Sequence, residues 1–83
     1  MSKIKLVVTR IGCKVELMAF LEGIKSEEIP SALSKELEKL SSFTDFEENT
    51  LIYFFQGTTF VERAKSLLFN FSQDKKIPFE LIE

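Results

Sequence analysis

LIYFFQ, residues 51–56, begins with five consecutive large apolar or aromatic residues and is closed by Gly57. The acidic, turn-like residues 45–50 precede it. An unbroken apolar run between two turn signals predicts a strand that is buried on both faces. The same run would promote aggregation if it were exposed, because it combines high β-propensity with no charge and no proline. The rest of the chain is therefore expected to cover it.

The N-terminal part of the chain predicts a β-hairpin. Residues 4–9 (IKLVVT) alternate in a way that places their even-numbered apolar side chains on one side of a first strand. Gly12 then permits a turn with a positive φ. Residues 15–21 fit a second strand with alternate apolar side chains on one face, although their Met, Ala and Leu also suit a helix. The hairpin is preferred, because Gly23 ends the run and a separate helix follows.

A first amphipathic helix is predicted to begin near Ser26, whose hydroxyl can cap it. Pro30 is tolerated only in the first turn, so the regular part starts near residues 29–30, and the helix ends by about Ser42. Its apolar stripe consists of Ile29, Leu33, Leu37 and Leu40. Phe43 and Phe46, in the linker that follows, are expected to pack against the core.

A second helix is predicted after Gly57, with a cap at Thr58 or Thr59 and an end at residues 74–76. Its buried stripe is expected to consist of Phe60, Ala64, Leu67 and Phe71, flanked by Val61 and Leu68. At 100° per residue, Phe69 points away from Phe60 and is expected to be exposed.

Residues 77–82 (IPFELI) predict a last strand, and Pro78, which lacks a backbone donor, indicates an edge position. The order of elements is then ββαβαβ. We expect an α/β fold with a single small domain over residues 1–83, in which a mixed four-stranded sheet carries two packed helices. The two crossovers are expected to join parallel neighbours with right-handed sense.

The coverage of the sheet has two possible outcomes. If the crossovers progress in one direction, both helices lie on one face and several apolar side chains stay uncovered, a pattern that marks a partner or self-association surface. The side chains at issue are Val7, Phe20, Ile52, Phe54 and Ile82. If the crossovers reverse direction, the helices cover both faces.

Composition narrows the class of protein. The chain has 83 residues, of which 45% are hydrophobic and 29% charged, and these values are typical of one soluble globular domain. A net charge of −2 argues against a general phosphate-backbone binder, so nucleic acid is not the expected partner. We expect no membrane association, because no segment approaches the roughly 18 apolar residues that span a bilayer and no signal peptide is recognised. A single cysteine favours a reducing compartment, and a cytoplasmic location is expected.

The usual catalytic side chains are scarce. The chain has no histidine, which removes the common general base and the commonest metal ligand. Cys13 lies near Arg10 and Lys14, but without a histidine partner it is interpreted as a packed or incidental thiol. The acidic cluster at residues 45–48 matches no calcium-loop spacing, and Tyr53 is interpreted as a core aromatic. We therefore assign no catalytic, metal or cofactor-binding residue and no small-molecule substrate, and expect no enzymatic activity.

Four segments together resemble the STAS domain, the sulfate transporter and anti-sigma factor antagonist fold: residues 20–24 (FLEGI), 30–40, 51–61 (LIYFFQGTTFV) and 77–82. That family has a strand ending near a glycine, an amphipathic helix, a buried strand closing on Gly-x-Thr-Phe-Ile, a helix and another strand. Its phosphorylatable serine follows an aspartate at the start of the second helix, where this chain has residues 62–65 (ERAK). The phospho-switch does not carry over. The resemblance implies a shortened, non-catalytic regulator that docks on another protein.

The favoured interpretation is a small protein-interaction or regulatory module that docks on a protein partner or associates with itself as a homodimer. The residues expected to contact the partner are Phe69, Arg63, Lys65, Arg10 and Lys14. One alternative is a nucleic-acid-associated protein that uses the basic N-terminal hairpin of Lys3, Lys5, Arg10 and Lys14, whose binding should weaken steeply with salt. Another is an inhibitor protein of the kind carried by mobile elements.

Overall fold

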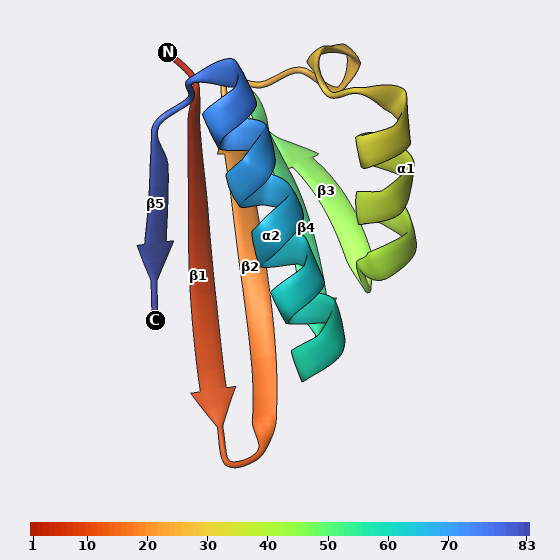
Figure 1. Ribbon diagram of the computed structural model, residues 1–83, viewed down its shortest axis with the longest axis vertical. Helices are drawn as coiled ribbons and strands as arrows, with labels where there is room; N and C mark the ends of the chain where they lie inside the picture. The colour runs from red at the N-terminus through yellow and green to blue at the C-terminus, as the bar shows by residue number, and fades with distance from the viewer.

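Five strands form one mixed sheet in the computed structural model, which describes residues 1–83 (Figure 1). The strands are β1 (Lys3–Ile11), β2 (Lys14–Glu22), β3 (Phe43–Glu47), β4 (Thr50–Gln56) and β5 (Phe79–Ile82). The helices are α1 (Ser31–Leu40) and α2 (Thr58–Lys75), and a short 3-10 turn, η1 (Ser26–Glu28), precedes α1. The mixed α/β class and the predicted ββαβαβ succession are confirmed, with β3 as an additional strand.

The N-terminal hairpin is confirmed. β1 and β2 pair antiparallel from Lys3↔Glu22 to Ile11↔Lys14, and Gly12 in the turn has a φ of +61°. Strand alternation sends every second side chain to the same face. The side chains on one face are buried, namely Ile4, Leu6 and Val8 of β1 and Val15, Leu17, Ala19 and Leu21 of β2. No helix forms in this region.

The linker after α1 contains an edge strand that we did not predict, so the expectation of four strands is corrected to five. β3 pairs antiparallel with β4 across a tight turn in which Glu48 and Asn49 both have positive φ. Phe43 and Phe46 were expected to pack against the core, but they are 50% and 57% exposed. All five residues of β3 are exposed, so the sequence has no alternation of apolar and polar residues here that would distinguish the strand from a loop.

The predicted parallel neighbours are also corrected. β2 and β4 are adjacent but antiparallel, because the chain passes through the additional strand β3 after α1 and reverses once more between β3 and β4. α2 joins β4 to β5, which run in the same direction but are separated by β2 and β1 in the sheet order β3-β4-β2-β1-β5. β5 pairs parallel with β1 at the edge, where Pro78 indicated that it would lie.

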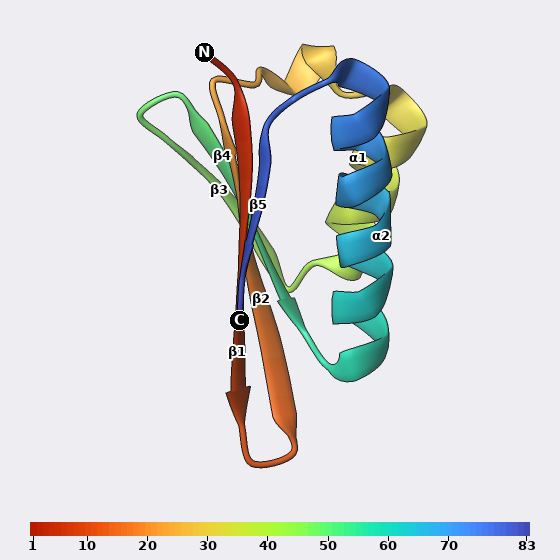
Figure 2. The same cartoon turned by 60° about the vertical axis from the view of Figure 1, so that its left-hand side comes forward.

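Both helices lie on the same face of the sheet, and no element covers the other face (Figure 2). The core forms between the helices and the sheet. α1 contributes Leu37, and α2 contributes Val61, Ala64, Leu68 and Phe71. Of the two expected outcomes, the one with both helices on the same face of the sheet is therefore found. Neither helix is long and apolar enough to cross a membrane.

α2 is rotated relative to the predicted stripe. Phe60 was expected to be buried but is 47% exposed, and Leu67 is only partly buried. No Thr58 or Thr59 side chain caps the helix; Gly57, with a φ of +99°, occupies the N-cap position. Its backbone N–H donates to the carbonyl of Val15 at 3.0 Å, which ties the start of the helix to β2. The buried face of the helix is formed instead by Val61, Ala64, Leu68 and Phe71.

The central strand β4 is buried on one face and partly buried on the other. Tyr53 and Phe55 face the helices and are 2% and 0% exposed. Ile52 and Phe54 point to the opposite face, where neighbouring side chains cover them only in part. The prediction of full burial on both faces was wrong, because both helices pack on the same side.

Replacing Phe55 should be far more costly than replacing its neighbour Phe54. Phe55→Ala removes a fully buried ring and should lower the free energy of unfolding by about 3–5 kcal/mol. Phe54→Ala removes a partly solvated ring, for which area burial gives a loss of about 1–2 kcal/mol. Urea denaturation of both variants measures the difference. Equal losses would contradict the one-sided core.

Candidate protein-binding surface

The uncovered side of the sheet, called the open face below, carries a continuous apolar row. Residues that are paired across neighbouring strands project to the same face of a sheet. The register aligns one apolar side chain from each of the five strands, in the order Ile82, Val7, Met18, Phe54, Phe43. The rings of Phe43 and Phe54 lie 5.4 Å apart between centroids. The apolar row therefore crosses the whole width of the sheet.

A second row lies beside the apolar row and mixes apolar and charged side chains. Phe20 and Ile52 pair across β2 and β4 and extend the apolar centre. Lys5 and Glu80 pair across β1 and β5 on one side of them, and Asp45 pairs with Ile52 from β3 on the other. The open face is thus apolar in the middle and charged towards both sheet edges.

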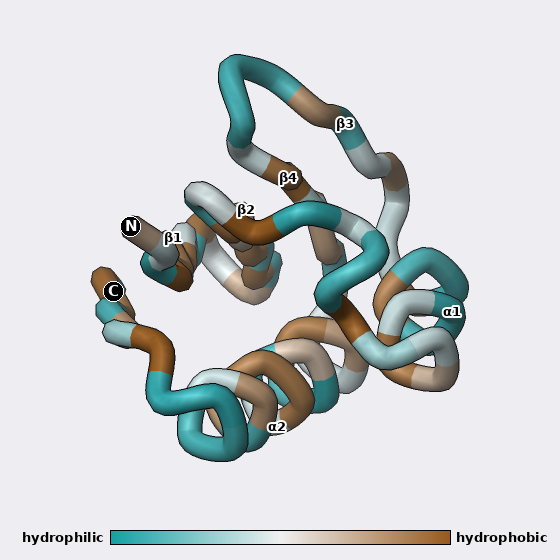
Figure 3. Tube along the Cα trace, turned by 90° about the horizontal axis from the view of Figure 1, so that it is seen from above, coloured by the Kyte–Doolittle hydropathy of each residue, from teal (hydrophilic) through white to brown (hydrophobic).

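No helix or loop packs over these side chains. Figures 2 and 3 show both helices on one side of the sheet, with the β3–β4 hairpin curving away from them. The side chains of Val7, Met18, Phe20, Ile52 and Phe54 are only partly buried. Large apolar side chains that lie together without a cover mark interaction surfaces.

Polar contacts border the open face at both ends of the strands. At one end, Ser42 Oγ lies 3.0 Å from Gln56 Oε1, and Gln56 Nε2 donates to Glu16 Oε2 at 3.2 Å. At the other end, Lys3 Nζ lies 2.8 Å from Glu80 Oε1. An apolar centre within a polar rim is the usual anatomy of a protein–protein interface.

Six charged side chains on the open face have no ion-pair partner: Lys14, Glu16 and Glu22 on the central strand β2, and Lys5, Asp45 and Glu47 on the strands to either side of it. None of the ion pairs in the structure involves Lys5, Asp45 or Glu47. Lys5 belongs to β1, whereas Asp45 and Glu47 belong to β3 at the opposite edge of the sheet. The open face is consequently basic on one flank and acidic on the other.

Two of the predicted partner-binding residues, Lys65 and Phe69, lie together in a small groove between α2 and β5. The groove has a volume of about 240 Å³. Phe69 is exposed, as predicted, but its ring packs edge to face on Phe79 at 5.4 Å. Lys65 Nζ forms an ion pair with Glu62 Oε2 at 3.4 Å. Phe69 therefore also helps to hold β5 against α2.

The other three predicted residues lie elsewhere. Arg63 Nη2 contacts Glu36 Oε2 of α1 at 3.2 Å, and Arg10 Nη2 contacts Glu83 Oε1 at 3.1 Å. Arg10 is paired with the buried Val15 and so lies on the helix-covered face of the sheet, whereas Lys14 lies on the open face. The five residues do not form one site. The ion pairs of Lys3 and Arg10 also reduce the charge that the basic hairpin can offer to phosphates.

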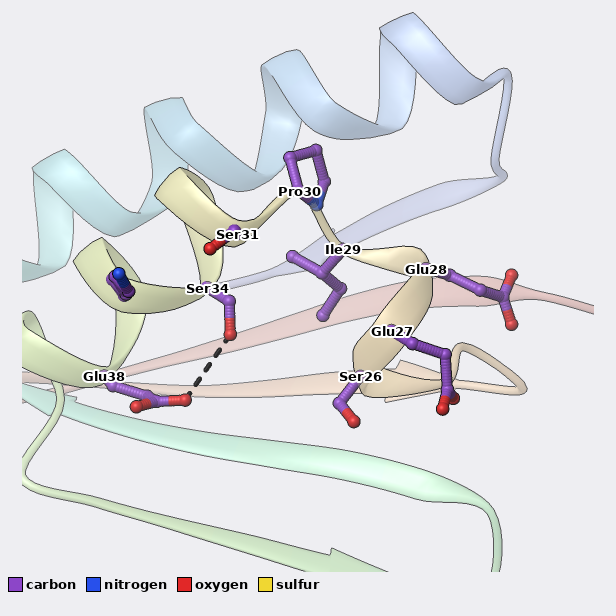
Figure 4. A pocket seen from close by; sticks show the side chains of 9 residues that line it. Ser26, Glu27, Glu28, Ile29, Pro30, Ser31, Ser34 and Glu38 are labelled. Carbon is purple, nitrogen blue, oxygen red and sulfur yellow. Dashed lines mark hydrogen bonds between the residues drawn. The ribbon is translucent and has the colours of Figure 1, made fainter.

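The largest hollow, about 680 Å³, lies between η1 and α1 (Figure 4). Its lining is polar, with Ile29 as its hydrophobic member. Ser34 Oγ contacts Glu38 Oε2 at 3.4 Å, while the carboxylates of Glu27 and Glu28 lie well apart from that of Glu38. No group of three or more acidic or thiol side chains is placed to hold a metal ion. The hollow presents no convergent set of reactive groups.

Tyr53 and Cys13 occupy contrasting environments. Tyr53 is a core residue, as predicted, and burial raises the pKa of its phenol above 10.0, so the hydroxyl is neutral at physiological pH. The nearby Glu38 charge acts in the same direction, and the Ser34 hydroxyl opposes it. Cys13 is exposed in the hairpin turn.

Sequence reasoning anticipated most, but not all, of the open face. Val7, Phe20, Ile52, Phe54 and Ile82 were expected to be uncovered if both helices lay on one side. The alternation expected for residues 15–21 places Met18 on the correct side of its strand, but Met18 was not identified as part of the patch, and Phe43 was assigned to the core. Asn49, directly before β4, was the available signal for a tight turn, since asparagine tolerates positive φ. Such a turn would have revealed the β3–β4 hairpin and with it the placement of Phe43.

Comparison of the chain with protein-family models, curated proteins and solved structures finds no match. The STAS resemblance thus stays a prediction. Any assignment of function must come from the geometry of the open face itself.

The Lys3–Glu80 pair should make the folded state sensitive to pH at both extremes. The hydrogen bond to Lys3, and then its charge, lower the pKa of Glu80 below 4.5, and the same contact raises the pKa of Lys3 above 10.5. The contribution of Glu80 is therefore present above its unfolded pKa and is lost as the pH falls through its folded pKa. That of Lys3 is present below its unfolded pKa and is lost as the pH rises through its folded pKa.

NMR titration of the Glu80 carboxyl carbon tests this contact directly. In Lys3→Met, the pKa of Glu80 should rise towards its ordinary value, because its hydrogen-bond donor and neighbouring charge are gone. Lys39→Met, which removes an exposed lysine of α1, should leave that pKa unchanged. A Glu80 titration that is the same in both variants would show that the pair does not form in solution.

Removing Phe69 should loosen β5, whereas removing Phe60 should not. Both side chains are 47% exposed on α2, but Phe69 alone of the two has an aromatic partner. Phe69→Ala should lower the free energy of unfolding by about 1 kcal/mol more than Phe60→Ala, the usual worth of an edge-to-face pair. Urea denaturation and hydrogen exchange of the β5 amides measure the effect. Similar values for the two variants would remove the structural role of Phe69.

Proposed function

We propose that this chain is a non-catalytic protein-interaction module, regulatory in role, that docks through the open face of its sheet. The observation that carries the proposal is the apolar row, which extends over all five strands without a covering element. An isolated domain gains nothing from leaving such side chains in water. A docked protein would bury them.

The rigidity of the surface supports docking. The side chains of the open face project from paired strands whose backbone is fixed by ladder hydrogen bonds. A preorganised surface loses little conformational entropy when a partner binds, so more of the burial energy appears as affinity. Phe20 and Phe54, near the centre of the sheet, belong to a residue class that supplies large contact area in interface cores.

The chemistry of the rest of the chain is consistent with binding rather than catalysis. The chain has no histidine, and the acidic residues of the largest hollow do not converge. The STAS resemblance, if it reflects kinship, implies a regulator that acts by docking on another protein. A free thiol at Cys13 fits a reducing compartment, and we place the module in the cytoplasm.

Polar substitutions on the open face should abolish docking while leaving the fold intact. The variant Ile52→Thr/Phe54→Thr replaces two central side chains with a residue that keeps high β-propensity. The matched control Phe46→Thr/Leu81→Thr replaces two exposed strand residues of the other face. Immobilised chain is exposed to extract of the source cell and to soluble chain, and retained proteins are compared.

The expected result is a set of proteins, a second copy included, that the unmodified chain and the control retain and the open-face variant loses. Circular dichroism verifies that each variant is folded. Equal retention by all three chains would show that the docking surface lies elsewhere.

A further inference from the structure

We infer that the occupant of the open face is a second copy of this chain, packed face to face about a two-fold axis that runs parallel to the strands and over β2. The inference rests on the proposed function, since it names the protein that docks. β2 is the central strand of the sheet. A two-fold axis over it places β4 opposite β1 of the second copy and β3 opposite β5.

This arrangement brings the apolar row of one copy onto that of the other. Met18 lies opposite the same residue, Phe54 opposite Val7 of the second copy, and Phe43 opposite its Ile82. Phe20, in the next row, also meets its own counterpart near the axis. Aligned sheets that pack face to face are about 10 Å apart, which suits side chains of this size.

The match between Lys5 and Asp45 favours this axis over the perpendicular one. Within one copy, Lys5 and Asp45 lie in the same row but three strands apart, about 14 Å, which is too far for an ion pair. With the axis parallel to the strands, Lys5 lies over Ile52 of the second copy, one strand from its Asp45. The lysine stem can cover the isoleucine while the ammonium reaches the carboxylate.

A two-fold axis that lies between the two sheets but runs perpendicular to the strands gives no such match. Each strand then faces its own counterpart, so Lys5 meets residues of β1 and Asp45 meets residues of β3. If the axis passes through the apolar row, Phe20 faces Glu16 of the second copy; if it passes beside that row, Phe43 faces Asp45. Both arrangements set an aromatic ring against a carboxylate and leave Lys5 unpaired.

Other charges near the axis are partly compensated. Glu80 lies opposite Asp45 of the second copy, but it is already bound to Lys3 at 2.8 Å. Glu22 lies opposite its counterpart at the end of β2, where its charge acts on Lys3. Glu16 also lies opposite its counterpart, but it accepts a hydrogen bond from Gln56 Nε2 at 3.2 Å, and Lys14 is two residues away on the same face. The net charge that faces each Asp45 from Lys3, Lys5 and Glu80 is therefore positive.

The available area is sufficient for a weak dimer. Five strands spaced about 4.8 Å apart, with open-face side chains over about 20 Å of strand, present roughly 480 Å² per copy. Two copies would bury on the order of 1,000 Å², which is the lower limit for a specific interface. The dimer is thus expected to dissociate on dilution.

Sedimentation equilibrium of charge-reversal variants tests the arrangement. Lys5→Glu and Asp45→Lys should each raise the dissociation constant of the dimer about tenfold, because each sets like charges against each other across the interface. The double variant Lys5→Glu/Asp45→Lys should return to within about threefold of the unmodified chain. Lys35→Glu, an exposed reversal on α1, should have no effect.

Circular dichroism checks that each variant is folded. If a charge-reversal variant is not folded, the neutral changes Lys5→Gln and Asp45→Asn supply the same coupling measurement. A chain that is monomeric at the highest attainable concentration would overturn the inference. A dimer in which the two reversals act independently would also overturn it. The proposed function fails separately, when the open-face threonine variant retains every protein that the unmodified chain retains.

Discussion

The antiparallel ladder between β2 and β4 is the constraint on which the rest of the structure depends. It joins the two hairpins, β1–β2 and β3–β4, into one sheet, with a register that extends from Glu16↔Gln56 to Glu22↔Thr50. The side-chain period of a strand is two, so a slip of one residue would exchange the two faces of β4. Tyr53 and Phe55 would then leave the core. Burial of these two rings against α2 and β2 therefore fixes the register.

The same register creates the open face. Once Tyr53 and Phe55 face the helices, Ile52 and Phe54 must face away from them, and the pairing aligns them with apolar residues of the other strands. α2 spans the sheet between β4 and β5, while α1 packs beside it on the same side. The chain thus has one helical layer for a sheet whose two faces are both apolar in the middle. The surface that we propose for docking is a direct consequence of this topology.

The edges of the sheet limit strand-to-strand pairing between copies of a chain that has such a face. β3 pairs with residues 50–54 of the long apolar strand β4, and its own side chains include Asp45 and Glu47. Charged residues on an edge strand discourage uncontrolled strand pairing. The polar contacts of Gln56 and the Lys3–Glu80 pair limit the apolar area at the strand ends. These features favour association through the face over growth at the edge.

The sequence by itself determined the elements whose signal is local. Alternation in residues 4–9 and 15–21 identified the hairpin, and Gly57 marked the start of α2 within a residue, because strand and turn preferences act over short distances. The tertiary structure alone decided the phase of α2, in which Val61, Ala64 and Leu68 face the sheet and Phe60 is exposed. It alone decided that residues 43–47 form a strand, since their pairing with β4 is made through backbone groups that every residue carries. It also decided that both helices share one face, because the direction of a crossover depends on the order of strands and leaves no trace in local composition.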